Sequence, residues 1–147
     1  MTATEITSAD STVAEAVEML GTAEGAAGDK IDMAADVVMS IQAAASVDLA
    51  DLKLIEDATT GLVTATLVTS VAGTVAEAKE IISVDEGAAG DKIDMAADVA
   101  VTVEAAASVD LADLKLIEEG TTGLLTSVAV TSAAGSSAEI GAGFVSE

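Results

Sequence analysis

The sequence lacks cysteine, histidine, tryptophan, tyrosine, proline and arginine, and Phe144 is its only aromatic residue. Without Cys and His the chain has no zinc site of the usual kind, no thiol nucleophile and no imidazole base. These absences exclude Ser-His-Asp and Cys-His catalysis. With no aromatic platform to stack a sugar or a base, we expect that the protein is not an enzyme.

Positive charge is also scarce, because only five Lys residues stand against 26 acidic residues, a formal net charge of −21 over 147 residues. Phosphate contacts need a basic surface, so we expect no nucleic-acid partner. The acidity favours cations as partners. An apolar content of 51% indicates a chain that folds around a core rather than one that stays disordered.

No signal peptide is visible, because Glu5 and Asp10 stand where a basic region and an apolar run are expected. Two uncharged runs, residues 58–76 and 120–138, reach the length of a membrane span. Both are rich in Thr, Ser and Gly and lack flanking basic residues. On this composition we therefore expect buried strands in these runs rather than membrane spans.

A long internal repeat dominates the chain. Residues 12–73 and residues 74–135 align without a gap at an offset of 62, with 44 of 62 positions identical. The identical stretches include EGAAGDKIDMAADV and AAASVDLADLKLIE. We divide the chain into a partial leading unit at 1–11, repeat 1 at 12–73, repeat 2 at 74–135 and a partial trailing unit or tail at 136–147.

Each repeat splits into two halves that open on a helix-capping residue. Thr12, Asp48, Thr74 and Asp110 each precede alternating apolar and acidic positions with helical spacing. Strand signals, rich in β-branched residues, follow at residues 37–42, 62–69, 99–104 and 124–131. A Thr-Gly pair ending at Gly61 predicts a helix stop with glycine in the left-handed conformation.

Helices alternating with strands favour parallel pairing, and a period of this length favours stacked repeats. We therefore predict an α/β repeat, a solenoid of helix–strand half-units with a parallel sheet. The alternative is an all-α helical bundle, because the Ala-rich residues 34–47 and residues 62–72 could continue as helices. The opening TATEITS aligns with TATLVTS from Thr64, so the chain is expected to start on a strand of a preceding unit.

One stretch of each repeat resembles a known family. DLADLKLIEDATTGLVTAT, from Asp48, is similar to the Ala/Thr-rich units of the form L-x-x-I-D-A-A-T-T-G-x-V-T-A-T in very large repetitive bacterial surface and extracellular proteins. The resemblance covers most of both copies. It implies a structural or adhesive role outside the cell, an extracellular or cell-surface location, and no catalytic residues.

Two acidic, glycine-containing loops are the candidates for metal binding. Calcium takes several carboxylate oxygens at one point, although these loops match neither an EF-hand nor a GGxGxD turn. The alternative is a solvated turn whose charges keep the surface soluble. The candidate calcium ligands are Glu24, Asp29, Asp32, Asp85, Glu86, Asp91 and Asp94.

The N-terminal strand pattern resembles an interior strand, and an uncapped parallel edge accepts another copy. Head-to-tail contacts of this kind do not close on themselves. We predict a non-enzymatic structural protein that assembles with itself into a filament, an extracellular matrix or a surface layer; the alternative is a monomeric module of a large calcium-dependent bacterial adhesin. The residues expected at the contact are Thr2, Thr4, Ile6, Leu124, Val128 and Val130.

Overall fold

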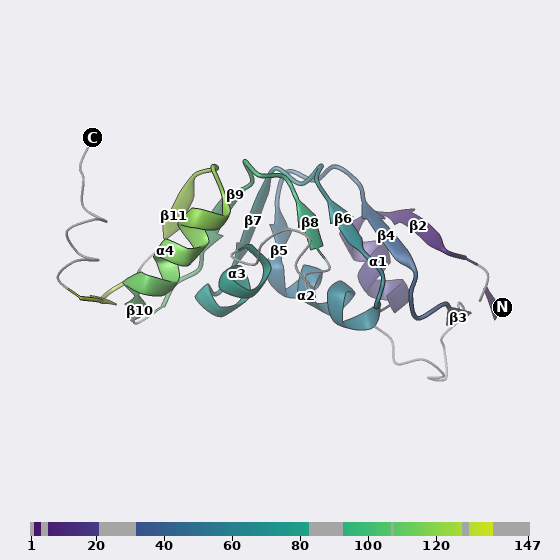
Figure 1. The fold of residues 1–147 in the computed structure, drawn as a ribbon, viewed down its shortest axis with the longest axis horizontal. Helices are drawn as coiled ribbons and strands as arrows, with labels where there is room; N and C mark the ends of the chain where they lie inside the picture. Colours follow the sequence, from purple (N-terminus) through teal and green to yellow (C-terminus); the bar gives the residue numbers. More distant parts are fainter. Residues whose placement is uncertain are drawn as a thin grey trace.

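The computed structural model describes residues 2–3, 6–20, 32–82, 93–106, 108–127 and 130–136. Within these residues the chain alternates short strands with four helices (Figure 1). The helices are α1 (Val13–Leu20), α2 (Leu49–Ala58), α3 (Val75–Ile82) and α4 (Leu111–Gly120). The strands are β1 (Thr2–Ala3), β2 (Ser8–Ser11), β3 (Asp32–Met33), β4 (Val38–Ile41), β5 (Val47–Asp48), β6 (Val63–Ala65), β7 (Ser70–Gly73), β8 (Ile93–Met95), β9 (Ala100–Val103), β10 (Val109–Asp110), β11 (Leu125–Ser127) and β12 (Ala133–Ala134).

The fold is α/β with parallel sheets, so the all-helical alternative is wrong. Residues 34–47 contain β4, and residues 62–72 contain β6 and most of β7. Along these strands buried residues alternate with half-buried or exposed ones, as expected on a pleated surface. None of the described helices has the length and apolar character needed to cross a membrane.

All four predicted helix starts are confirmed, because α1 to α4 begin directly after Thr12, Asp48, Thr74 and Asp110. The Asp48 carboxylate accepts the Ala50 N–H at 2.9 Å, and the second copy repeats this bond between Asp110 and Ala112. A side chain that accepts an N–H of the first turn satisfies a donor that the helix itself leaves unpaired. The capping residues therefore fix where each helix begins.

The predicted helix stop is wrong in its mechanism. Helix α2 ends at Ala58, Thr59 is already extended, and Gly61 does not adopt the left-handed conformation. A Cβ on Gly61 would instead lie 2.4 Å from the Val37 carbonyl oxygen. Glycine is required here because the backbone passes too close to the preceding strand to leave room for a side chain.

Strand pairing follows a regular pattern along the chain. One four-stranded parallel sheet has the order β2-β4-β6-β8, and a second has the order β11-β9-β7-β5. Paired residues lie 30 positions apart between β2 and β4 and between β7 and β9, and 24 apart between β4 and β6 and between β9 and β11. Each of these pairings encloses one helix, so the predicted parallel strand–helix–strand connections are confirmed.

We use the word rung for each group of strands that lies before α1, between two successive helices or after α4. The two-strand rungs are β1–β2, β6–β7 and β11–β12, and the three-strand rungs are β3–β4–β5 and β8–β9–β10. Every strand of a two-strand rung pairs only with strands of three-strand rungs. The two kinds of rung therefore alternate through the described structure.

The predicted strands over residues 62–69 and 124–131 are shorter than expected. A turn at Thr66 and Leu67 interrupts the first, so that β6 ends at Ala65 and β7 is a separate strand. In the second, β11 covers Leu125–Ser127, and Leu124, Val130 and Thr131 are not in a strand, while residues 128–129 lie outside the described residues. The short strands β2 and β7, which directly precede α1 and α3, are Ser- and Ala-rich. β2 lies in the leading unit 1–11, which is predicted as a strand, and β7 lies in the uncharged run 58–76, where buried strands are expected.

The core lies between the strands and the helices, which follow one another along the molecule in chain order (Figure 1). Helix α2 buries Leu49, Leu52 and Ile55 on one face, at the spacing expected of an amphipathic helix. The strands contribute inward-facing residues such as Val63 and Val71. Adjacent helices also pack on one another, α1 on α2, α2 on α3 and α3 on α4.

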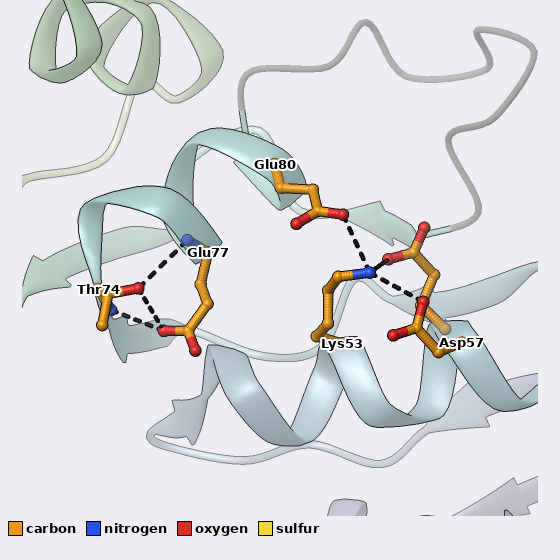
Figure 2. A network of polar contacts seen from close by, with 6 residues as sticks. Lys53, Asp57, Thr74, Glu77 and Glu80 are labelled. Atoms are coloured by element: carbon orange, nitrogen blue, oxygen red, sulfur yellow. Dashed lines mark hydrogen bonds and ion pairs between the residues drawn. The ribbon is translucent and has the colours of Figure 1, made fainter.

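Glu77 closes a capping box at the start of α3, with Thr74 as its partner (Figure 2). The Thr74 N–H and Oγ1 both donate to Glu77 Oε2 at 2.8 Å, and the Glu77 N–H donates to Thr74 Oγ1 at 3.3 Å. The bonds from the Thr74 backbone and hydroxyl lower the pKa of Glu77 below its ordinary value of 4.5.

We expect the substitution Glu77→Gln to reduce the free energy of unfolding at neutral pH. We also expect the free energy of unfolding of the variant to change less with pH in the acidic range than that of the parent protein. Because the pKa is lower in the folded state, the stabilisation is complete above the unfolded value of 4.5 and is lost as pH falls through the folded pKa. Urea unfolding of both proteins between about pH 7 and about pH 3 measures the difference. A difference that stays constant over this range contradicts the expectation, and Glu104→Gln is the exposed control.

Candidate assembly surface

The predicted calcium ligands are only partly placed by the structure. Glu24, Asp29, Asp85, Glu86 and Asp91 lie outside the described residues. Asp32 is in β3 opposite Thr2, and Asp94 is half-buried in β8 opposite Thr64. The described part of the chain contains no group of three or more acidic residues arranged to hold a metal ion. Calcium binding therefore stays a prediction.

The predicted contact residues lie at the two ends of the row of strands. Thr2 is in β1, and Ile6 is exposed just before β2. Leu124, just before β11, is the most exposed large apolar side chain in the described structure at 72%, and Val130 is half-buried. Thr4 and Val128 lie outside the described residues. Apolar side chains thus stand exposed beside both terminal rungs.

The contact between neighbouring rungs is built by a Thr-Thr-Gly segment. The buried Thr59 hydroxyl donates to the Val37 carbonyl oxygen at 2.6 Å and accepts the Gly61 N–H at 2.9 Å. The Thr60 N–H donates to the Ala35 carbonyl oxygen at 2.7 Å. One short segment therefore pairs with the backbone carbonyl groups of the turn that precedes β4 and holds the next rung against it.

The same contact recurs in the second repeat with nearly the same geometry. The Thr121 hydroxyl donates to the Val99 carbonyl oxygen at 2.6 Å and accepts the Gly123 N–H at 2.9 Å. The Thr122 N–H donates to the Ala97 carbonyl oxygen at 2.7 Å. The sequence thus encodes one rung-to-rung interface and uses it twice.

Two lysine side chains connect neighbouring helices, and Figure 2 shows the first of them, Lys53. Lys53 of α2 contacts Glu80 of α3 at 2.9 Å, and Lys79 of α3 contacts Asp113 of α4 at 2.8 Å. The hydrogen bonds that Lys53 donates to the Asp57 and Glu80 carboxylates raise the pKa of Lys53. These pairs are partly exposed to solvent, so we expect them to align the helices more than to stabilise them.

A hollow of about 300 Å³ lies between α1 and the segment that leads into β5. Its lining includes Thr12, Gln42, Asp48 and Asp51. The Asp48 carboxylate is already occupied as the cap of α2, and the hollow is open to solvent. No feature of the sequence predicts this hollow, and the hollow lacks the enclosure that a pair of catalytic carboxylates requires.

Comparison of the chain with known protein families, with curated proteins and with solved structures gives no match. The contacts between rungs are therefore the guide to function. Within the described residues, no strand pairs with the outer edge of β2 or with the outer edge of β11. Such edges carry free backbone donors and acceptors that can pair with another strand.

Proposed function

We propose that the chain is a non-enzymatic structural protein, an α/β solenoid that assembles head to tail with further copies of itself into a filament, an extracellular matrix or a surface layer. The observation that supports this proposal is the repeated rung interface. Thr59 and Thr121 make the same bonds at the same distances in two successive units. An interface that the chain uses twice within itself is suited to repeated use between copies.

The exposed edges support the same proposal. The outer edges of β2 and β11 lie at opposite ends of the strand pattern, and Ile6 and Leu124 are exposed beside them. A contact that joins one end of a copy to the other end of the next does not close, so it generates an open filament.

Net charge sets the conditions for assembly. Copies that each carry a formal charge of −21 repel one another, and the repulsion reaches about 30 Å at 0.01 M ionic strength but only about 8 Å at 0.15 M. We therefore expect monomers at low salt and filaments at high salt.

Location is part of the proposal. We place the protein outside the cell or on the cell surface, because of the likeness of residues 48–66 to repeat units of large bacterial surface proteins. A high acidic charge also suits a protein that meets salt and divalent cations.

Light scattering and negative-stain electron microscopy of the purified chain test the proposal over a salt series. The expected result is regular filaments whose amount rises with NaCl. Short separate particles at every salt concentration would contradict self-assembly.

A divalent-ion series at constant ionic strength separates screening from specific binding. Calcium that acts only by screening gives the same result as magnesium, and a chelator reverses both equally. Calcium binding to a protein that stays monomeric would favour the alternative role as a module of a calcium-dependent adhesin.

A further inference from the structure

The alternation of rungs limits how two copies can join. The described strand pattern begins and ends with a two-strand rung, β1–β2 at one end and β11–β12 at the other. The two-strand rung between them, β6–β7, pairs only with three-strand rungs. The rung β6–β7 shows the full arrangement, with β4 and β5 on one side and β8 and β9 on the other. Simple stacking of two copies would place two two-strand rungs together, which happens nowhere within the chain.

The two terminal rungs differ in charge. Residues 63–73, the rung in the middle of the chain, carry no charged side chain, and residues 125–135 carry none either. Residues 1–11 carry Glu5 and Asp10. Charged side chains on an edge strand discourage pairing with another chain. The last rung therefore has the composition of an interior rung, and the first does not.

A glycine ends two of the three two-strand rungs, for a steric reason. A Cβ on Gly73 would lie 2.8 Å from the Leu49 Cβ, and a Cβ on Gly135 would lie 2.9 Å from the Leu111 Cβ. Each leucine is the first residue of the helix that leaves the neighbouring three-strand rung. Only glycine lets the two-strand rung approach that leucine.

Ser11 occupies the equivalent position in the first rung, at the offset of 62 from Gly73. It is only 3% exposed, and its hydroxyl has no hydrogen-bond partner in the described structure. The first rung therefore buries an unpaired polar group where it lies. If another copy placed its three-strand rung against this first rung, the leucine that begins the following helix of that copy would meet the Ser11 Cβ, as Leu49 would meet a Cβ on Gly73.

We propose that copies join by strand replacement: residues 125–135 of one copy take the place of residues 1–11 of the next and pair with its β3 and β4. This inference rests on the self-assembly proposed above and specifies which residues of two copies are in contact. The joining rung then lies between two three-strand rungs, as β6–β7 does. Strand pairs are exchanged one for one, while the unpaired Ser11 hydroxyl leaves the pairing and Gly135 enters. Residues 1–11, which carry two acidic residues, are replaced by the uncharged residues 125–135.

The opposite replacement, in which residues 1–11 displace residues 125–135 of another copy, is disfavoured. It would set Ser11 against Leu111, where Gly135 now lies with no space for a Cβ. It would also bring Glu5 and Asp10 into a rung that is uncharged. Ser11 and Gly135 together give the junction its direction.

Two engineered disulfides test the direction, and the absence of native cysteine makes each specific. Ser8 and Val38 are paired and both exposed, so Ser8→Cys with Val38→Cys locks the first rung in place when oxidised. Ser108 and Ser132 are also exposed, one position before the pair formed by Val109 and Ala133, so the corresponding cysteines lock the last rung. Filament mass is measured by sedimentation in assembling salt, oxidised and reduced.

We expect oxidation of the first lock to lower filament mass about tenfold or more. The lock holds residues 1–11 in place, so it weakens the equilibrium that joins copies by at least that factor. Oxidation of the last lock leaves the mass unchanged, because residues 125–135 stay with their own copy. Equal assembly of the oxidised and reduced forms of the first lock overturns strand replacement but not self-assembly. If the reduced proteins form no filaments, the proposed function itself fails.

Discussion

Replacing Gly61 with alanine is expected to lower the free energy of unfolding by about 3 kcal/mol or more. The new Cβ would lie 2.4 Å from the Val37 carbonyl oxygen and 2.5 Å from that of Asp36. These atoms are backbone, and the Val37 oxygen is already held by the Thr59 hydroxyl at 2.6 Å. Relief of the clash therefore requires two rungs to separate.

Urea unfolding of the variant and the parent protein measures this loss. The second repeat supplies a matched position, because a Cβ on Gly123 would lie 2.2 Å from the Val99 carbonyl oxygen. Thr66→Ala, at an exposed turn position of the same segment, is the control. A loss below about 1 kcal/mol at both glycines would contradict the close rung contact.

Replacing Leu52 with alanine is expected to lower the free energy of unfolding by about 2–5 kcal/mol. Leu52 is completely buried on the inward face of α2, between the strands and the neighbouring helices. Its loss leaves a cavity that the surrounding side chains fill only in part. The lost apolar contacts therefore appear as lost stability.

Leu54 on the same helix is the matched control, because its side chain is 50% exposed. We expect Leu54→Ala to change the unfolding free energy by about 0.5 kcal/mol or less. Thermal or urea unfolding of the two variants compares them directly. Equal losses at Leu52 and Leu54 would contradict the assignment of the buried face.

Helix starts could be predicted from the sequence because capping is local. The bonds of Thr74 with Glu77, and of Asp48 with Ala50, span three residues or fewer, so the residue types alone indicate them. The strands β4 and β9 were predictable for a similar reason, since their residues combine β-branching with alternation.

The roles of Gly61 and Thr59 could not be predicted, because they depend on a strand more than twenty residues away. A Thr-Gly pair after a helix indicates a left-handed stop when it is read locally. Here the pair instead meets the backbone before β4, at Ala35 and Val37. Only the register of the rungs, which alternates between offsets of 30 and 24, brings these residues together.

Assembly through the candidate surface stays a prediction, but one strand beside it is confirmed. The alignment of Thr2 with Thr64 predicts a strand, and β1 includes Thr2. The significance of Ser11 was missed. Its alignment with Gly73 and Gly135 is visible in the sequence, but the steric need for glycine appears only with Leu49 and Leu111 in place.

The most direct test of the central claim, that copies continue the internal stack of strands, is fibre diffraction from aligned filaments. Strands stacked along the filament place their spacing of about 4.7–4.9 Å parallel to the fibre axis. The account therefore predicts a strong meridional reflection at that spacing. A filament without this reflection, or with it on the equator, would show that copies join by some other surface and would contradict the account.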